Sequence, residues 1–577
     1  MKAVHGGAAW RARVHVVLAA WVVVALDAPK PLVVDDAAYV LFARQIAAHP
    51  LDPYGFEIFW SQEPEPAFDV LAPPLLPYWL AGSMLLLGDE PPRWKLALLP
   101  FTLAFAGSLW WLCARFAPGL EAPLVWMAVL SPSVLPFLNL MLDVPAAALA
   151  LLALALFLAA CDRPSLALAA AAGLLGGFAM QTKYTGATAV AGMLAWGALH
   201  ARLRHALVAV AVAACVFWGW EGLMALRYGQ SHLVQGVLHL WPQRRGASPL
   251  AALVWSVGFL TIAGAMAPAV GVLGLAALGG SRRAVGAAAL GVASVFALLP
   301  LFPGGALPEP DLWPSLRGAP AEQLLFAGLG CATAASVLGA AVRIARRGRT
   351  PADRFLVAWL AIELAGFATL SPFLAARRAL GASLASLVLC GRAAVASLGP
   401  ERARRAVRVP LALGAALGAL FAAADFADAV AVRDAVARAS LRLEELGAGT
   451  GRGTVWYLGH WGFQFYAERA GMQPVVEGET RLHRGDWLVV PEGVSKPMIR
   501  APGASPRPEQ FEIRSASPWS THPWAYMGPL PIAPRADAQV RVSLHRVLRG
   551  FVPPREAGAD REPRPRESPG GSLRSSP

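Results

Sequence analysis

Long apolar runs, separated by short connections that carry arginine, dominate residues 1–426 of this 577-residue chain. A membrane-spanning helix needs about 20 apolar residues, and soluble domains do not hold one such run after another. Hydrophobic residues make up 56% of the chain and charged residues only 15%. The sequence therefore predicts a mainly α protein, a polytopic bundle of membrane helices.

Thirteen of these runs are expected to be helices. They lie near residues 12–29, 94–114, 119–139, 143–160, 165–181, 184–200, 205–226, 250–277, 284–302, 322–342, 354–371, 378–396 and 409–426. The first run follows Arg11 and Arg13 and could also be a signal peptide, but no small-residue cleavage site follows it. We expect an uncleaved first helix.

The positions of the basic residues predict the orientation of the bundle. With the N-terminus inside, the arginine clusters fall on the connections that face the cytoplasm, as the positive-inside rule requires. Residues 30–93 and everything after residue 426 then lie outside. The predicted location is the plasma membrane, multi-pass, with the C-terminal domain extracytoplasmic, or periplasmic if the cell is Gram-negative.

Three regions are expected: a transmembrane domain over 1–426, a small extracytoplasmic α/β domain over 427–550 and a disordered tail over 551–577. Within the first outer loop, 36–48 and 75–87 are predicted to be interfacial helices. In the second region, strands are predicted at 455–458, 486–490 and 540–547, with a helix at 463–470.

The placement of charged residues and cysteines excludes some classes of partner and site. The formal net charge of +13 could indicate nucleic acid, but the arginines lie in short loops between apolar runs, so no nucleic-acid partner is expected. The five cysteines lie in or beside apolar runs and none forms a CxxC pair. Neither a disulfide framework nor a thiolate metal site is predicted.

Asp35 and Asp36 are adjacent carboxylates at the predicted outer boundary, directly after the first apolar run. Ionisable groups at such a position cost free energy and are functional candidates. An aspartate before a helix is also an ordinary N-cap, and a second one in the first turn suits the helix dipole. Spacing alone leaves both interpretations open.

Four further charged residues lie at the same predicted level. Asp143 precedes Val144-Pro145 and could be an N-cap, but it would share the outer boundary with Asp35. Lys183 is either a lysine whose ammonium group reaches the interface or a point charge for a phosphate. Arg377 and Arg378 lie outside, against the positive-inside trend.

These residues predict one cavity in the outer leaflet that offers carboxylates for base catalysis or metal, and cations for a phosphate. Such a set suits an enzyme whose substrate is a lipid-linked phosphate. A transporter or flippase of lipid-linked sugars is the first alternative, although the sequence shows no inverted repeat, broken helix or midplane charge. A non-catalytic membrane scaffold is the second.

The chain resembles glycosyltransferase superfamily C, in the branch of dolichyl-phosphate-mannose protein mannosyltransferase-like and aminoarabinose-transferase-like membrane proteins. The resemblance lies in Asp35-Asp36 with Tyr39, Pro73-Pro74-Leu75 with Tyr78-Trp79, Leu142-Asp143-Val144-Pro145 and Thr182-Lys183-Tyr184-Thr185-Gly186. Beyond residue 230 it is architectural, although Gly459-His460-Trp461-Gly462-Phe463-Gln464-Phe465-Tyr466 resembles the extracytoplasmic domain of some bacterial members.

This resemblance implies an inverting transfer of a hexose or pentose from a polyprenyl-phosphate sugar to a hydroxyl of a lipid, glycan or protein. It implies Asp35 as general base, Asp143 positioning the acceptor or a metal, and Lys183 with Arg377 holding the carrier phosphate. Asp36 would share the catalytic site. Tyr39, Tyr184 and Arg378 would contact the substrate. Some relatives bind a divalent cation, but no ligand cluster for a metal is visible here.

Overall fold

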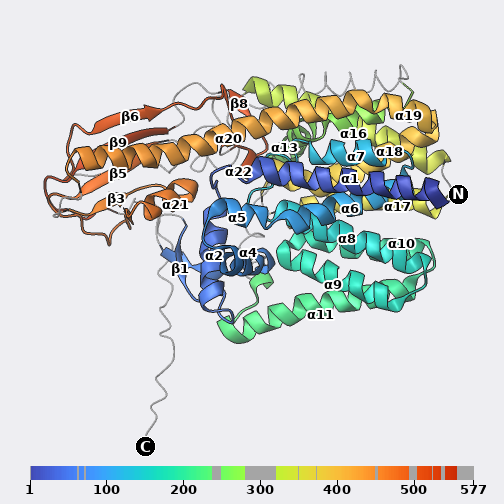
Figure 1. Cartoon of the computed structure of the whole chain (residues 1–577), viewed down its shortest axis with the longest axis horizontal. Coiled ribbons are helices and arrows are strands. Elements are labelled where there is room, and N and C mark those ends of the chain that lie inside the picture. The colour runs from blue at the N-terminus through green and yellow to red at the C-terminus, as the bar shows by residue number, and fades with distance from the viewer. Residues whose placement is uncertain are drawn as a thin grey trace, which may run out of the picture.

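The computed structural model describes residues 2–60, 64–70, 73–234, 236, 249–279, 320–347, 350–371, 373–448, 453–492, 503–522, 524–534 and 540–554. Figure 1 shows an elongated molecule, with a helical bundle towards one end and a β-sheet at the other. The helix expected at 284–302, and the tail from residue 555 onwards, lie outside the described residues.

Helices make up nearly all of the bundle. They are α1 (Lys2–Asp27), α2 (Asp36–Ala48), α3 (Ala67–Val70), α4 (Leu75–Leu87), α5 (Pro91–Leu96), α6 (Leu99–Phe116), α7 (Glu121–Val129), α8 (Asp143–Asp162), α9 (Leu166–Thr182), η1 (Tyr184–Gly186), α10 (Ala187–Leu199), α11 (Leu203–Tyr228), α13 (Pro249–Met266), α14 (Pro268–Ala277), α16 (Pro320–Arg347), α17 (Pro351–Leu370), η4 (Ala376–Ala379), α18 (Leu380–Leu398) and α19 (Pro400–Ala406). The short strands β1 (Glu57–Phe59) and β2 (Pro64–Pro66) pair in the first outer loop.

A helix lies at every predicted position within the described residues. By length and composition, six helices there could cross a membrane, or seven if the bent pair α13 and α14 counts as one span. The total of thirteen therefore stays a prediction. The two helices predicted in the first outer loop are present as α2 and α4, and these two pack against each other. Their placement in the membrane interface stays a prediction.

Two predicted helices are interrupted by proline, and their predicted bounds are wrong. The helix expected over 119–139 ends at Val129, because Pro132 cannot donate a backbone hydrogen bond and restricts the residue before it. The helix expected over 250–277 is bent by 81° where Pro268 opens α14. The first interruption leaves 130–142 as a chain of turns beside the start of α8.

The long helix α20 (Arg408–Glu445) runs from the bundle to the sheet (Figure 1). Its predicted end at residue 426 is wrong, because the apolar pattern continues on one face. Val432, Val436 and Leu443 on that face pack against the sheet residues Tyr457 and Val542. The domain boundary predicted after residue 426 therefore falls inside a continuous helix.

The C-terminal region contains β3 (Val455–Tyr457), α21 (Trp461–Arg469), β4 (Gln473–Pro474), β5 (Trp487–Glu492), β6 (Glu509–Ile513), β7 (Trp519–Ser520), α22 (Trp524–Met527), β8 (Ala533–Pro534) and β9 (Val540–Arg546). Five of the strands form a sheet in the order β4-β3-β5-β9-β6. Strand β3 runs parallel to β4 and β5, whereas β9 is antiparallel to β5 and β6. The three predicted strands and the predicted helix are all present. Strands β7 and β8 pair separately, beside the bundle.

Candidate active site

Asp35 and Asp36, at the start of α2, bind different partners. Asp36 is fully buried, and its two carboxylate oxygens accept the backbone N–H groups of Val33 and Leu140, each at 3.0 Å. Asp36 thus connects the loop before α2 to the turns before α8 by hydrogen bonds. Asp35 makes no capping hydrogen bond with its side chain. Its carboxylate instead binds Arg377, so Asp35 occupies the N-cap position without capping the helix by its side chain. Asp36 lies in the first turn of α2, where its charge suits the helix dipole.

Arg377 joins the two carboxylates that were predicted to meet. Its Nη2 donates to Asp35 Oδ2 at 2.7 Å, and its Nη1 donates to Asp143 Oδ2 at 3.2 Å. Asp35 precedes α2, Asp143 opens α8 and Arg377 lies in η4, so three distant segments converge on one guanidinium group. The planar fork of arginine suits this double contact.

Lys183 completes the charged cluster. It follows the last residue of α9, and its ammonium group pairs with the other oxygen of Asp143. Asp143 is the first residue of α8, where Pro145 fits the opening turn. The side chains of Asp143 and Arg377 are only 4% and 6% exposed, whereas those of Lys183 and Asp35 are 13% and 16% exposed. Asp35 is therefore the carboxylate of this cluster that is most accessible from outside.

The backbone is strained directly before Asp35. Val34 has a φ of 37°, a conformation that is unfavourable for a β-branched residue. Such strain persists only where the surrounding contacts hold it, and it gathers at functional sites. Here the contacts of Asp36 on the following turn provide that restraint.

A small pocket opens beside the cluster, between α8, η1, α17 and α18. Polar groups at this pocket come from several elements. They are Asp143, Lys183, Thr185, Thr188, Glu363 and Arg378. Within the described residues, the side chain of Arg378 makes no hydrogen bond or ion pair, and its Nε is buried. Arg378 therefore offers the pocket a cation that no carboxylate has neutralised.

Glu363 is a polar residue of the pocket that the sequence prediction missed. It lies within the apolar helix α17, where Trp359 Nε1 donates to its carboxyl group at 3.0 Å. A carboxyl group inside an apolar helix is costly and marks a functional candidate by default. That rule, applied to the run at 354–371, would have identified Glu363.

The two predicted tyrosines lie in different surroundings. Tyr39 is buried in α2 within the field of Asp35 and Arg377, and burial raises the pKa of its phenol. Tyr184 lies in η1, and its hydroxyl group is 3.0 Å from His232 Nδ1. Tyr184 is not part of the lining of the pocket, although its neighbours Lys183 and Thr185 are.

The residues of the cluster do not form a ligand set for a divalent cation. Asp35 and Asp143 both bind Arg377, and Asp143 also binds Lys183. Two cations thus take three of the four carboxylate oxygens of Asp35 and Asp143. Throughout the described part of the chain, no three His, Cys, Asp or Glu side chains are grouped to hold a metal.

A second, larger pocket is almost wholly apolar. It lies between α13, α16, α17 and α18, and Ala382 on α18 lines both pockets. Ala379, which follows Arg378, also lines the apolar pocket. Charged groups and an apolar pocket are therefore neighbours along one short stretch of chain.

The fold and the site together define a protein with several membrane-length helices and a charged pocket where α8 and α18 begin. No family model matches the chain, and no curated protein matches it. Several solved structures do. Those of an archaeal oligosaccharyltransferase and of a bacterial ArnT share between 14% and 16% sequence identity with the chain, and their TM-scores are below 0.5.

Two of these solved structures are of the oligosaccharyltransferase from Archaeoglobus fulgidus. The apo form has a TM-score of 0.45 at 16% identity, over 80% of this chain and 64% of that chain. The complex with an inhibitory peptide and a dolichol-phosphate has a TM-score of 0.46 at 15% identity, over 81% and 64%. This chain thus spans slightly less than two thirds of that protein's length.

A third is ArnT from Cupriavidus metallidurans bound to undecaprenyl phosphate. It has a TM-score of 0.33 at 15% identity, over 84% of this chain and 93% of that chain.

Proposed function

We propose that this protein is a membrane glycosyltransferase that moves a sugar from a polyprenyl-phosphate donor to a hydroxyl group of a lipid, glycan or protein. The observation that carries the proposal is the cluster itself. Two carboxylates from separate elements share Arg377 beside a pocket that also presents Lys183 and Arg378. This arrangement places a candidate base, Asp35, beside a pocket that offers an anion site.

In the proposed reaction Asp35 is the general base. Its carboxylate takes the proton of the acceptor hydroxyl as the acceptor oxygen bonds to the anomeric carbon of the sugar. The bond from that carbon to the carrier phosphate breaks, and polyprenyl phosphate leaves. Attack opposite the leaving group inverts the anomeric centre. Asp143 orients Arg377 and Lys183 around the reacting groups.

The leaving phosphate is held by Lys183 and Arg378. The guanidinium of Arg377 is occupied by two carboxylates, so in this proposal it orients Asp35 rather than binding the phosphate predicted for it. Cations near the departing oxygens stabilise the charge that develops there. Glu363 lies in the same pocket and would accept hydrogen bonds from sugar hydroxyls, while Tyr39 and Tyr184 support the walls around the cluster.

The apolar pocket between α13, α16, α17 and α18 suits the polyprenyl chain. It begins beside the residues that follow Arg378, so a phosphate at Arg378 would place the first prenyl units at its entrance. The donor would enter from the outer leaflet of a bacterial inner membrane. The sheet region after residue 426 would then be periplasmic.

The test uses the full-length protein in liposomes, with undecaprenyl-phosphate hexoses and pentoses as donors and envelope lipid extract as acceptor. Release of free undecaprenyl phosphate is expected. Asp35→Asn should lower it by more than about 100-fold. The matched control is Asp162→Asn, which removes an exposed ion pair with Arg115 at the other end of α8. Near-normal release by Asp35→Asn would refute the base assignment.

A transporter of lipid-linked sugars remains the alternative, and one observation bears on it. The sequence showed no broken helix, but α13 and α14 form one, bent by 81°. Transporters use such breaks to bind ions or substrate. Neither α13 nor α14 contains a charged residue, which favours the enzyme. A transporter would carry the donor across the liposome membrane with the bond between sugar and phosphate intact, and a scaffold would tolerate loss of Asp35.

A further inference from the structure

The C-terminal region reaches back into the bundle and contacts Arg377. After β6 the chain leaves the sheet and forms β7 and α22 beside η4. There the backbone N–H of Ala376 donates to the carbonyl of Gly528 at 3.0 Å. The Nε of Arg377 donates to the carbonyl of Tyr526 at 3.2 Å.

The hydrogen bond to the Tyr526 carbonyl fixes the orientation of the Arg377 guanidinium group. Two sides of the Arg377 guanidinium bind Asp35 and Asp143, and the Nε bond is the third side. A planar group held at three sides cannot rotate without breaking a charge-assisted bond. The ring of Tyr526 also lies 6.0 Å from the guanidinium carbon, which is within cation–π range.

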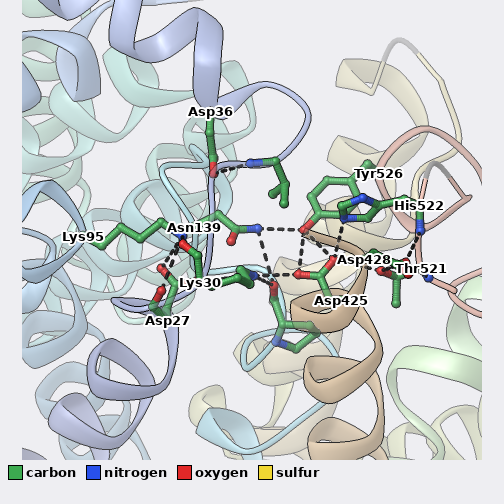
Figure 2. A network of polar contacts seen from close by, with 12 residues as sticks. Asp27, Lys30, Asp36, Lys95, Asn139, Asp425, Asp428, Thr521, His522 and Tyr526 are labelled. Carbon is green, nitrogen blue, oxygen red and sulfur yellow. Dashed lines mark hydrogen bonds and ion pairs between the residues drawn. The ribbon is translucent and has the colours of Figure 1, made fainter. Parts of the chain in front are cut away.

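Tyr526 is itself held by its hydroxyl group, which is buried in a polar network (Figure 2). Asn139 Nδ2 donates to this hydroxyl at 2.7 Å, and the hydroxyl donates to Asp425 at 2.9 Å. Asp425, in α20, also accepts from the ammonium group of Lys30 at 2.6 Å. The network therefore connects the end of the first helix, the turns before α8, α20 and the C-terminal region.

Asp428, one turn further along α20, binds backbone N–H groups of the chain just before Tyr526. Its carboxylate accepts the N–H groups of Thr521 at 2.8 Å and His522 at 3.1 Å. Asp425 accepts the Thr521 hydroxyl at 2.8 Å and lies 3.0 Å from His522 Nε2. Because buried carboxylates are costly unless they are fully hydrogen-bonded, this network fixes Thr521, His522 and Tyr526 in one place.

We propose that Tyr526 is a positioning residue. Through its carbonyl and its hydroxyl, the C-terminal region holds Arg377, and with it Asp35 and Asp143, in the geometry that sugar transfer requires. The inference rests on the proposed function for its kinetic consequence, but the placement of Arg377 by Tyr526 can be tested without turnover. It gives the region after residue 426 a direct part in the reaction centre.

The test compares Tyr526→Phe with Tyr457→Phe in the full-length protein in liposomes. Both changes remove one hydroxyl from a buried tyrosine. Tyr457 donates to Glu468 at 2.8 Å in the sheet region and does not touch Arg377, so it is the matched control. For Tyr526→Phe, kcat for release of undecaprenyl phosphate should fall by about ten- to a hundredfold, with KM for the donor unchanged. The control should leave kcat unchanged.

A second measurement does not need activity. The side chain of Arg377 is 6% exposed, so phenylglyoxal should modify it slowly in the wild-type protein and in Tyr457→Phe. In Tyr526→Phe it should react faster, as measured by fragment-ion mass spectrometry that separates modification of Arg377 from that of its neighbour Arg378. Equal modification in all three proteins would overturn the positioning role. If the wild-type protein released no carrier phosphate but Arg377 became reactive in Tyr526→Phe, only the proposed function would fail.

Discussion

Asp36 differs from its neighbour Asp35 in that its carboxylate is closed off from solvent and committed to two backbone N–H groups. It lies outside the membrane-length helices, and burial raises its pKa to about 6. The folded state therefore holds a proton on Asp36 that the unfolded chain releases nearer pH 4. Its contribution to stability falls as pH rises from about 4 to about 6 and is constant above that range.

The free energy of unfolding should be about 1 to 3 kcal/mol lower for the variant Asp36→Asn. The reason is that an amide can accept a hydrogen bond from only one of the two N–H groups and turns its own NH₂ towards the other. The deficit should be larger at pH 4 than at pH 7, since the variant lacks the proton that stabilises the wild-type protein at low pH. Thermal unfolding in detergent across this pH range measures both effects. A deficit that grows with pH would contradict the assignment.

The residues of the cluster were predictable to different degrees. Asp143 and Lys183 each lie at a helix end, and the predicted topology put both ends on one side of the membrane. Tyr526 gave no such signal, because it contacts Asp425 across 101 residues of sequence and no local pattern encodes that distance. The pairing of Arg377 with two carboxylates likewise depends on tertiary contacts.

At the scale of elements, apolar runs located the helices, but prolines and partner surfaces set where they end. Pro132 and Pro268 were visible in the sequence and their effect on α7 and α13 follows from backbone chemistry. The extension of α20 was not visible in hydropathy, because its second half is covered by the sheet rather than by lipid. Its apolar stripe is too narrow to resemble a membrane span.

Helix α21 docks on the segment before Asp35, and a glycine permits the approach. A Cβ on Gly462 would lie 2.5 Å from the carbonyl oxygen of Leu32, which is backbone and cannot move aside. The hydroxyl of Tyr466 accepts the N–H of Leu32 at 3.0 Å beside it. This contact explains the Gly459 to Tyr466 motif as a docking surface.

Gly462→Ala should therefore cost about 1 to 3 kcal/mol of stability. The control Gly222→Ala adds a methyl group to α11 with nothing within 4 Å, so it should be neutral or slightly stabilising. Denaturation in detergent micelles, followed by tryptophan fluorescence, compares the two variants. Equal stability of both would show that α21 does not pack against Leu32.

At the scale of the whole molecule, the predicted orientation has a direct test. Ala516→Cys and Arg163→Cys, each in a cysteine-free background, place a thiol at an exposed position in the C-terminal region and at the end of α8. A membrane-impermeant maleimide added to intact cells with a permeabilised outer membrane should label the first and not the second. Labelling of Arg163→Cys alone would invert the topology and move the cluster to the cytoplasmic side.

Helix α20 contains 38 residues, so it is an unbroken rod about 57 Å long. Asp425 and Asp428 hydrogen-bond to the returning C-terminal chain partway along this helix, and the sheet packs against the part of the helix that follows them. Each residue of a helix rotates it by about 100°. The number of residues between Asp428 and the part of α20 that packs on the sheet therefore sets the angle at which the sheet is held around the helix axis relative to the bundle. One residue inserted between these two contacts would rotate the sheet to another side of the helix axis, so the length of this part of α20 is fixed by the contacts at its two ends.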